Sequence, residues 1–373
     1  MPIRVLEICG KLNIGGAQRV AANIGMYAPE NCKVTYLVYC DTVGEYEAAL
    51  TERGCRILHQ PSPREIGRGY VKKLSALIRE GAYDVVHCHT MFSSGLVMLA
   101  AWQGGAKGRI CHSHTAKDNS RLTVRRRAYR CFSRLLIRSF GTEFLACGGD
   151  AGAELYGKRW FQKHGRVLRN GIDIERFRYD AEKASQTVKA YGLEGRFVIG
   201  HVGHYVDVKN QSFLIRLMPE IAAKRPEAIL LMFGAGEDRA KLEALIRETG
   251  MEAHAKLMGN IPDVSRVLSA FDVFAFPSKF EGTPLALIEA QANGLPCLIS
   301  DQIPEDACLT KLIRRLPLDQ QEAWISAILS AGRENPEDWA NEVAKNYETV
   351  AQSMNTLYEI FNQYQAAGRK RHA

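Results

Sequence analysis

The stretch of sequence that decides the fold is Pro277-Ser-Lys-Phe-Glu-Gly-Thr-Pro-Leu-Ala-Leu-Ile-Glu-Ala-Gln-Ala-Asn-Gly-Leu-Pro296. A short apolar strand is predicted just before it, over Val273–Ala275. Thr283 is placed to cap a helix whose first residue is Pro284, and Gly294 with the proline after it ends that helix after about ten residues. The loop between strand and helix therefore presents free amides and the positive end of a helix dipole, which together attract an anion.

Two glutamates of this stretch, Glu281 and Glu289, are separated by seven residues. Taken alone, the first is equally well explained as a surface-loop residue and the second as an ordinary helix carboxylate. The whole string, however, resembles the family 4 retaining glycosyltransferases, whose E-x7-E motif matches these two residues. The resemblance implies an α/β fold of the GT-B type, in which two Rossmann-like, doubly wound parallel-sheet domains face each other across a cleft.

The resemblance also implies roles for residues of this stretch. The donor would be a nucleotide diphosphate sugar, with UDP favoured. Glu281 would bind hydroxyls of the donor sugar, and Glu289 would hold the ribose hydroxyls. A carboxylate that accepts hydrogen bonds from two neighbouring hydroxyls makes a charge-assisted and specific contact. The amides around Gly282–Leu285 would hold the diphosphate.

A second strand-to-helix loop, Gly203-His-Tyr-Val-Asp-Val-Lys-Asn-Gln211, follows the predicted strand Arg196–Val202. By itself, Lys209 is better explained as a solvated lysine near a helix start. The family typically has Gly-Arg here, followed five residues later by Lys-Asn, so the resemblance implies that Lys209 stabilises the departing diphosphate. Here His204 replaces the arginine. Either His204 is protonated beside the phosphates, or Lys209 and another basic group do this work.

The first strand-to-helix loop, Gly10-Lys-Leu-Asn-Ile-Gly-Gly-Ala-Gln-Arg19, matches neither a dinucleotide fingerprint nor a P-loop. Gly15 and Gly16 still permit close approach of a ligand to a helix N-terminus, although a tight turn without a ligand explains them as well. The resemblance implies that this pair lies near the donor phosphates. It also implies that the loop around Ile261 reads the base through its backbone; a packing turn is the alternative for that loop and for Phe233-Gly-Ala-Gly-Glu237.

Four histidines occur as two pairs, His87-Cys-His89 and His112-Ser-His114, at the predicted carboxyl ends of strands, where α/β sheets place ligands. Zinc is one interpretation of four histidines with nearby cysteines. We favour a metal-free site, on the expectation that the two members of each pair point to opposite faces of their strand. No Asp-x-Asp occurs in the chain, which fits a metal-independent enzyme without a cofactor. By resemblance His114 faces the sugar, with His89 a weaker candidate.

Short apolar runs alternate with helix-length segments along the chain, the pattern of βα units around a parallel sheet. We predict an N-terminal domain over 1–172, a C-terminal nucleotide-sugar domain over 173–350, and a helix over 351–373 that packs back toward the N-terminal domain and ends in a basic tail. The predicted strands are Ile3–Cys9, Lys33–Tyr39, Asp84–Cys88, Gly108–His112, Glu143–Ala146, Arg196–Val202, Ala228–Phe233, Ala255–Met258, Val273–Ala275 and Pro296–Ile299.

Composition and length fit a two-domain globular protein. The chain has 373 residues, 46% hydrophobic and 24% charged, which excludes a disordered chain. The longest apolar runs are too short to span a bilayer, and the N-terminus reads as a strand rather than a secretion signal. Ten cysteines without a C-x-x-C pair fit a reducing compartment. We therefore expect a cytoplasmic protein.

The formal charge of +8 is concentrated in residues 121–138, which contain seven arginines and no acid. Arginines recur there at helical spacing while the apolar residues face elsewhere, so we predict a basic amphipathic helix on an anionic membrane. Nucleic acid is a weaker alternative because no nucleic-acid module occurs, and a solvated helix face is the other. The predicted membrane-facing residues are Arg125, Arg126, Arg127, Arg130 and Arg134.

The sequence thus predicts a metal-independent, retaining glycosyltransferase that is peripherally associated with the inner face of the cell membrane. It would move a sugar from a nucleotide diphosphate, UDP favoured, to a hydroxyl of a membrane-lipid-linked glycan in surface polysaccharide synthesis. Glu281, Lys209 and His114 are the predicted catalytic residues. Two alternatives remain: a nucleotide-sugar 2-epimerase of the same architecture, and a non-catalytic membrane-associated partner.

Overall fold

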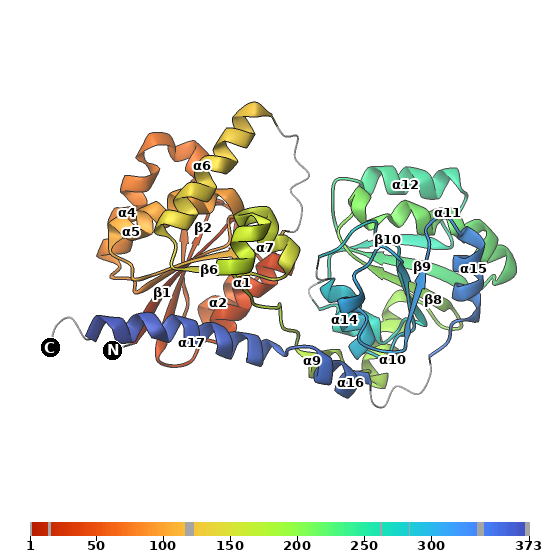
Figure 1. Ribbon diagram of the computed structural model, residues 1–373. Helices are drawn as coiled ribbons and strands as arrows, with labels where there is room; N and C mark the ends of the chain where they lie inside the picture. Colours follow the sequence, from red (N-terminus) through yellow and green to blue (C-terminus); the bar gives the residue numbers. More distant parts are fainter. Residues whose placement is uncertain are drawn as a thin grey trace. The chain divides into compact units, whose positions relative to one another are not determined.

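A computed structural model describes residues 2–13, 16–115, 123–261, 263–282, 284–333 and 339–369, with side chains described as far as 365. The chain forms two compact units, each built on one parallel sheet (Figure 1). Unit 1 comprises Met1–Gly171 and Val350–Ala373, and unit 2 comprises Ile172–Thr349. The chain passes from unit 1 to unit 2 after residue 171 and returns after residue 349, in each case one residue before the predicted boundary.

The sheet of unit 1 has seven parallel strands in the order β3-β2-β1-β4-β5-β6-β7. The chain winds outward from β1 in one direction and then returns to start the other half at β4, so the sheet is doubly wound. The strands are β1 (Ile3–Cys9), β2 (Cys32–Val38), β3 (Arg56–His59), β4 (Val85–Cys88), β5 (Gly108–Ser113), β6 (Glu143–Ala146) and β7 (Arg166–Val167).

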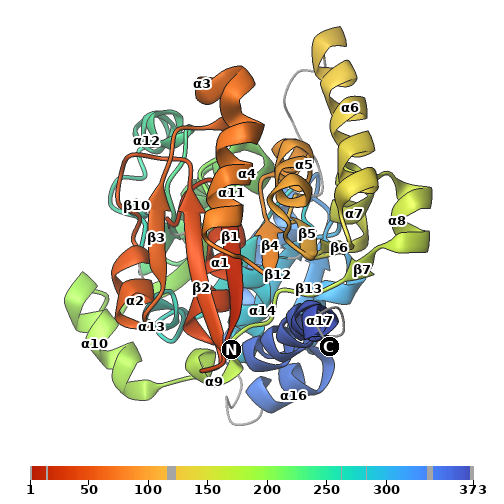
Figure 2. The same ribbon diagram turned by 90° about the vertical axis from the view of Figure 1, so that its left-hand side faces the viewer.

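Helices cover both faces of this sheet (Figure 2). One face packs on α4 and α5, and the other on α1, α2 and α17. The last of these, α17, returns from unit 2 and places six side chains in the unit 1 core, from Val350 to Phe361. The helices are α1 (Gly16–Met26), α2 (Glu47–Glu52), α3 (Pro63–Ile66), α4 (Tyr70–Glu80), α5 (Ser94–Gly104), α6 (Val124–Phe140), α7 (Gly149–Tyr156), α8 (Lys158–His164) and α17 (Val350–Arg369).

The sheet of unit 2 has six parallel strands in the order β10-β9-β8-β11-β12-β13 and is also doubly wound. The strands are β8 (Phe197–Val202), β9 (Ala228–Phe233), β10 (Ala255–Gly259), β11 (Val273–Phe276), β12 (Cys297–Ser300) and β13 (Ile313–Leu316). The helices are α9 (Ile174–Phe177), α10 (Ala181–Tyr191), α11 (Gln211–Lys224), α12 (Arg239–Glu248), α13 (Ser265–Leu268), α14 (Leu285–Ala292), α15 (Gln321–Ser330) and α16 (Trp339–Asn346).

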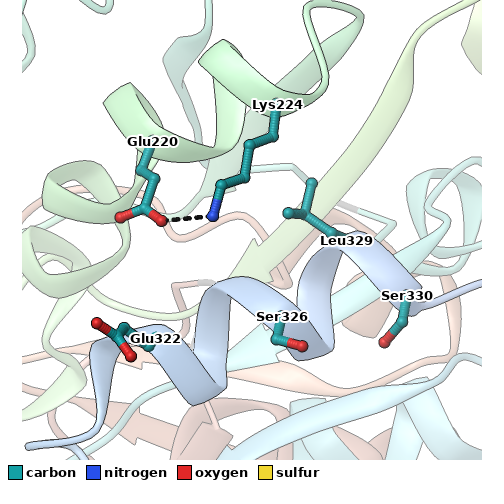
Figure 3. A pocket seen from close by; sticks show the side chains of 6 residues that line it. All are labelled: Glu220, Lys224, Glu322, Ser326, Leu329 and Ser330. Atoms are coloured by element: carbon teal, nitrogen blue, oxygen red, sulfur yellow. Dashed lines mark hydrogen bonds and ion pairs between the residues drawn. The ribbon is translucent and has the colours of Figure 1, made fainter.

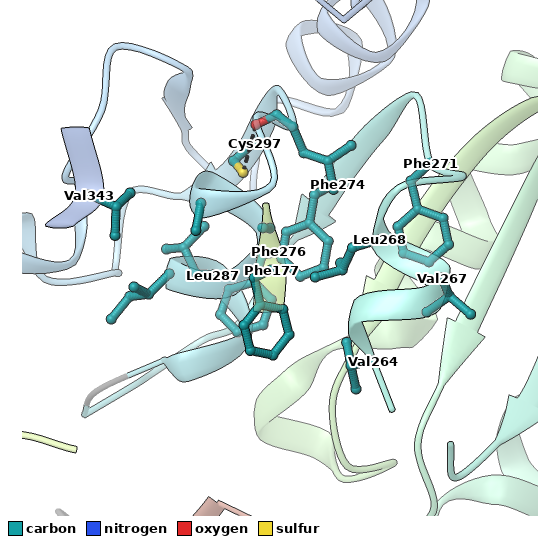
Figure 4. Packing of buried hydrophobic residues seen from close by; sticks show 14 of the residues in the cluster. Phe177, Val264, Val267, Leu268, Phe271, Phe274, Phe276, Leu287, Cys297 and Val343 are labelled. Carbon is teal, nitrogen blue, oxygen red and sulfur yellow. Dashed lines mark hydrogen bonds between the residues drawn. The ribbon is translucent and has the colours of Figure 1, made fainter. Parts of the chain in front are cut away.

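Aromatic side chains fill one side of the unit 2 core, where α9, α13, α14 and α16 pack on the sheet (Figure 4). Phe271, Phe274 and Phe276 are almost completely buried there. The ring of Phe271 lies directly on the β8 backbone, because a Cβ on Gly200 would be 1.9 Å from it. The opposite face packs on α11, α12 and α15 around the buried Trp324. Each face of the sheet therefore has its own helix layer, which leaves the carboxyl ends of the strands free to carry loops.

All ten predicted strands are present, with ends that differ by one residue at most. Three strands were not predicted: β3, β7 and β13, each at or near an edge of its sheet. Within the described ranges, no helix has the length and hydropathy that a membrane span requires.

Candidate active site

The central feature of unit 2 is the point where its strand order reverses, between β8 and β11. The chain runs outward from β8 through β9 to β10 and then returns to place β11 on the other side of β8. Ligands of open α/β sheets bind at the carboxyl ends of strands at such a switch point, because the two loops diverge there. Lys209 lies in the loop after β8 and Glu281 in the loop after β11.

These two residues form an ion pair. Lys209 Nζ donates to Glu281 Oε1 at 2.5 Å, although 72 residues separate them in sequence. The side chains are only 19% and 10% exposed, and the lysine ammonium also lies 5.2 Å from the centre of the Phe276 ring. Two residues that the family resemblance singled out in separate loops thus meet at one point, in a partly desolvated place where a charge acts strongly on an anion.

The two loops are tied together by further contacts. The backbone amide of Lys279 donates to the carbonyl of Val208 at 2.8 Å, and Asn210 Nδ2 donates to the carbonyl of Pro277 at 3.2 Å. An exposed ion pair joins Lys279 to Asp207 at 2.8 Å. Asn210 itself is left-handed, with φ +56°, a conformation that asparagine tolerates better than most residues. Two hydrogen bonds and an ion pair between the loops therefore hold the Lys209–Glu281 pair in place.

Helix α14 follows Glu281 and begins one residue later than predicted. Pro284 is the N-cap, not the first helical residue, because its ψ of +83° is outside the helical range while its carbonyl accepts from Leu287 and Ile288. Thr283 lies outside the described residues. The first amides, beginning at Leu285, have no acceptor within the helix, and Gly282 in front of them is exposed. Glu289 lies on the same helix and is 2% exposed.

Backbone packing explains the glycines of the neighbouring loop. A Cβ on Gly234, whose φ is +148°, would lie 2.0 Å from the carbonyl oxygen of Gly203, and a Cβ on Gly236 would lie 2.3 Å from that of Tyr205. His204 is exposed, and its Nδ1 lies 3.2 Å from the carbonyl of Ala235. These glycines therefore let two loops pack tightly beside His204.

The loop after β10 is joined to the same group. The Gly234 amide donates to the carbonyl of Gly259, and the Gly259 amide lies 3.3 Å from the hydroxyl of the buried Tyr205. Ile261, two residues further on, is partly buried against the aromatic core. The structure thus places Ile261 beside, and not within, the loops that hold Lys209 and Glu281.

One residue of this region, His201, was not predicted from the sequence. It is buried at the end of β8, and burial lowers the pKa of its ring to about 4. Its Nδ1–H donates to the carbonyl of Ala275, so Nε2 accepts from Gln211 at 3.2 Å. The same Gln211 amide donates to the carbonyl of His204. Gln211 thereby links His201 to the first part of the loop that carries Lys209. The only sequence signal of His201 is a polar residue inside an apolar strand.

Unit 1 has its own polar cluster at its switch point, between β1 and β4. Glu7, fully buried in β1, accepts from Nδ1 of His87 at 3.1 Å and from Nε2 of His89 at 3.0 Å. His89 Nδ1 and His114 Nε2 are 2.7 Å apart, and the ring centre of His112 lies 4.2 Å from that of His114, with the two rings tilted by 33°. Two of the four predicted histidines therefore contact a carboxylate that the sequence analysis did not single out, and the other two lie against their rings.

The expectation that each histidine pair diverges is wrong. Side chains two apart on a strand lie on the same face, since only immediate neighbours alternate. The ring centres of His87 and His89 are accordingly 4.3 Å apart, and those of His112 and His114 are 4.2 Å apart. Among the described residues, His87, His89 and His112 form one group in which each ring offers one nitrogen and these three nitrogens lie within 4.8 Å of one another, close enough for one cation.

Burial governs the protonation of this cluster. It lowers the pKa of His89, and it lowers the pKa of His112 and His114 far more, with neighbouring imidazoles adding to the effect. Burial opposes ionisation of Glu7, yet attraction to His87 and hydrogen bonds from His87 and His89 leave its pKa below the usual value. The cluster is therefore a carboxylate close to three rings, those of His89, His112 and His114, whose protonation burial opposes.

The glycine pair lies in the loop after β1. Gly15 lies outside the described residues, and Gly16 is the first residue of α1. A Cβ on Gly16 would meet no heavy atom within 4 Å, so the start of this helix is open to close approach.

Helix α6 is the predicted basic helix, but two of its arginines face inward. Arg130 is 8% exposed and pairs with Glu154 at 3.2 Å, and Arg134 donates to the carbonyls of Glu154 and Leu155. Their guanidinium groups also lie over the ring of Phe92. The prediction that Arg130 and Arg134 face a membrane is therefore wrong. Arg130 pairs with the Glu154 carboxylate, and Arg134 binds carbonyls at the C-terminal end of α7, where the helix dipole attracts cations.

The outward face of α6 is an apolar stripe with arginines on either side. Val124, Phe132 and Leu135 are 84%, 51% and 61% exposed. Arg125 and Arg127 are exposed, and Arg126 is partly exposed. This combination of apolar centre and basic flanks is the pattern of a helix that lies in a membrane interface.

A surface groove of unit 2 lies between α11 and α15 (Figure 3). It is lined by Glu220, Lys224, Glu322, Ser326, Leu329 and Ser330, and the first two form an exposed ion pair at 2.7 Å. None of the predicted site residues lines it.

Two doubly wound units, one with the E-x7-E motif at its switch point, define the class of the protein as a glycosyltransferase of the GT-B fold. The model of "Glycosyltransferase Family 4" matches residues 14–176, and that of "Glycosyl transferases group 1" matches residues 185–307. The chain is 31% identical to EpsF of Bacillus subtilis (strain 168), a protein described as a glycosyltransferase, over 96% of both chains. The chain belongs to glycosyltransferase family 4.

Two further proteins are similar along most of their length. The capsular polysaccharide biosynthesis glycosyltransferase CapH of Staphylococcus aureus is 25% identical, over 87% of this chain and 90% of CapH. The crystal structure of Anabaena HepE in complex with UDP and glucose has a TM-score of 0.78 at 16% identity, covering 97% of this chain and all of HepE. The second likeness shows the fold.

Proposed function

We propose that this glycosyltransferase transfers a sugar, with retention, from a UDP-sugar to a hydroxyl of a membrane-lipid-linked glycan during surface polysaccharide synthesis. The observation that carries the proposal is the Lys209–Glu281 pair, held at the unit 2 switch point in front of the α14 N-terminus. HepE was crystallised with UDP and glucose, which favours UDP. CapH is named for capsular polysaccharide biosynthesis, which favours this pathway class.

In the proposed reaction, the bond between the anomeric carbon and the β-phosphate oxygen breaks. The acceptor oxygen attacks from the same face, and its proton passes to the departing diphosphate. Negative charge therefore grows on the diphosphate, and Lys209 together with the first amides of α14 stabilises it. Glu281 orients the sugar through its hydroxyls, and Glu289 holds the ribose. The chemistry needs no metal at the phosphates because a cation and a helix N-terminus are already there.

The donor and the type of reaction are tested by mass spectrometry of products from a panel of UDP- and GDP-sugars. Each donor is supplied with and without lipid-extracted acceptor. We expect acceptor-dependent transfer from a UDP-sugar, with slow donor hydrolysis in the absence of acceptor. An isomerised donor would instead indicate an epimerase, and absence of both turnover and binding would indicate a non-catalytic partner.

We also propose that α6 holds the enzyme on the anionic inner face of the cell membrane. Its apolar stripe would enter the interface while Arg125, Arg126 and Arg127 bind lipid headgroups, each contributing about 1 kcal/mol near the surface. Arg125→Glu/Arg127→Glu should weaken sedimentation with phosphatidylglycerol vesicles by at least about tenfold at low salt. Salt should weaken the wild-type protein in the same way.

Arg64→Glu/Arg68→Glu is the matched control, because both arginines are exposed in unit 1 and the change in charge is the same. This control should bind nearly as well as wild type. Equal losses in both double variants would show attraction by net charge alone, and unchanged binding of the α6 variant would refute the proposed surface.

A further inference from the structure

The carboxylate of Glu7 begins a hydrogen-bonded chain through His89 to His114. The contacts are 3.0 Å from Glu7 Oε2 to His89 Nε2, and 2.7 Å from His89 Nδ1 to His114 Nε2. Glu7 is fully buried and the side chain of His89 is 4% exposed. The arrangement crosses three adjacent strands, because Glu7 lies in β1 and the two histidines directly follow β4 and β5.

Each contact of this chain fixes the position of one proton. An ionised carboxylate can only accept, so His89 must donate to it through Nε2. A neutral imidazole carries one proton, and His89 Nδ1 is therefore an acceptor. His114 must then donate to it through Nε2, which leaves His114 Nδ1 without a proton. The buried charge of Glu7 thus selects the tautomer of His114, although the two residues are connected only through His89.

The last atom of this hydrogen-bonded chain, an acceptor nitrogen of His114, has no donor facing it among the described residues. His114 Nδ1 is buried and has no hydrogen-bond partner among the described residues. Leaving such an acceptor unpaired costs free energy, so a partner for it is expected in the working state of the protein.

We propose that Glu7 and His89 are positioning residues that hold His114 in the Nε2–H tautomer, so that its Nδ1 presents a hydrogen-bond acceptor to a hydroxyl of the sugar substrate. The proposal rests on the proposed function. It adds a rule of specificity: the site takes sugars with a free hydroxyl at that position and rejects the deoxy analogue, whose missing donor leaves the acceptor unpaired.

A bound cation is the competing explanation of the cluster. In this arrangement both nitrogens of His89 are engaged, by Glu7 and by His114, whereas the unpaired nitrogens are His87 Nε2, both of His112 and His114 Nδ1. A cation held by His87, His89 and His112 together would have to take one nitrogen of His89 from Glu7 or from His114. The two explanations therefore differ in which atoms His89 contacts.

The test is nitrogen NMR of the full chain labelled at the histidine rings, with His114→Gln to assign the signals. We expect His114 to be protonated at Nε2 and bare at Nδ1. Glu7→Gln removes the charge that fixes His89 Nε2 as a donor, because an amide both donates and accepts, and His114 should therefore gain the Nδ1–H form. The matched control is Glu47→Gln, because Glu47 is also buried and also accepts from a histidine, His59, at 3.1 Å in the same unit.

Two results would overturn the inference. One is an Nδ1-protonated His114 in the wild type, or a His114 tautomer that Glu7→Gln leaves unchanged. The other is a stoichiometric metal ion, detected by elemental analysis of the purified protein or after addition of Zn²⁺, whose binding is lost in His112→Ala. These measurements need no substrate, so they stand even if the proposed transferase function fails.

A kinetic measurement then tests the link to specificity. UDP-glucose, UDP-galactose and their monodeoxy forms are compared as donors, and the acceptor glycan is compared in the same way. We expect wild type to reject one monodeoxy sugar by at least about tenfold in kcat/KM, and Glu7→Gln to lose that preference while Glu47→Gln keeps it. An equal preference in Glu7→Gln and wild type would contradict the proposed role of His114 Nδ1.

Discussion

Replacing Lys209 with alanine should lower kcat at least about 10²- to 10³-fold while the protein stays folded. The ammonium group lies at the switch point with its side chain four-fifths buried, and in the proposed reaction its charge acts on the departing diphosphate with little screening by water. Glu281→Ala should cost a similar factor, because the lysine loses its 2.5 Å partner and the sugar loses its carboxylate. Steady-state kinetics with a UDP-sugar and acceptor measures both.

The same two loops contain a suitable control. Lys279→Ala breaks the exposed pair with Asp207, which links the same loops but leaves the buried pair intact. It should change kcat less than about threefold, as expected for a surface pair worth under about 1 kcal/mol. Lys209→Arg keeps the charge and should recover part of the lost rate. Near wild-type rates in both Lys209→Ala and Glu281→Ala would refute the assignment, as would equal losses in Lys279→Ala.

Lowering the pH from 6.5 to 5 should destabilise unit 1 by several kcal/mol. The pKa values of His89, His112 and His114 are lowered by burial, so the unfolded chain takes up protons near pH 6.5 that the folded unit does not. Stability from these rings is therefore present above pH 6.5 and is lost as the pH falls. Each ring that stays neutral in the folded unit contributes a slope of up to about 1.4 kcal/mol of unfolding free energy per pH unit, so the three rings together contribute at most about 4 kcal/mol per pH unit.

Hydrogen exchange read by mass spectrometry distinguishes the units. Peptides from β1, β4 and β5 should show the steep dependence, while β8 and β11, near the single buried His201, should show about one third of it. His112→Gln should reduce the slope of unit 1, and His164→Gln, at an exposed histidine of the same unit, should not. Equal slopes in the two units, or a slope of unit 1 that His112→Gln leaves unchanged, would contradict the prediction.

The doubly wound architecture was predictable because buried parallel strands are continuous apolar runs, such as Ala228–Phe233. The strands that were missed lack this signal. β13 has the sequence Ile-Arg-Arg-Leu with both arginines exposed, and β3 has no fully buried residue. Pairing with a neighbouring strand, and not local hydrophobicity, puts such edge segments in a sheet.

The sequence analysis named candidate site residues in strand-to-helix loops, on the strength of the family resemblance, and missed residues that only contacts in the structure reveal. Lys209 and Glu281 follow strands that the sequence reveals. The buried Glu7 is one acid in an apolar strand, and only the structure shows the histidines around it. Helix α6 was misread for a related reason: periodicity shows that arginines share a face, but not that backbone carbonyls of α7 satisfy that face.

The return of α17 to unit 1 has a consequence for the order of biosynthesis. Its side chains from Val350 to Phe361 complete the first core, yet the ribosome makes them only after the whole of Ile172–Thr349. At synthesis rates of about 5–20 residues per second, the first 171 residues exist for roughly 10–35 seconds before α17 is made, and during that time one side of the unit 1 core is incomplete. The unit whose sequence comes second is thus the first that can finish folding, and a nascent chain arrested before Val350 should expose an apolar surface that chaperones bind.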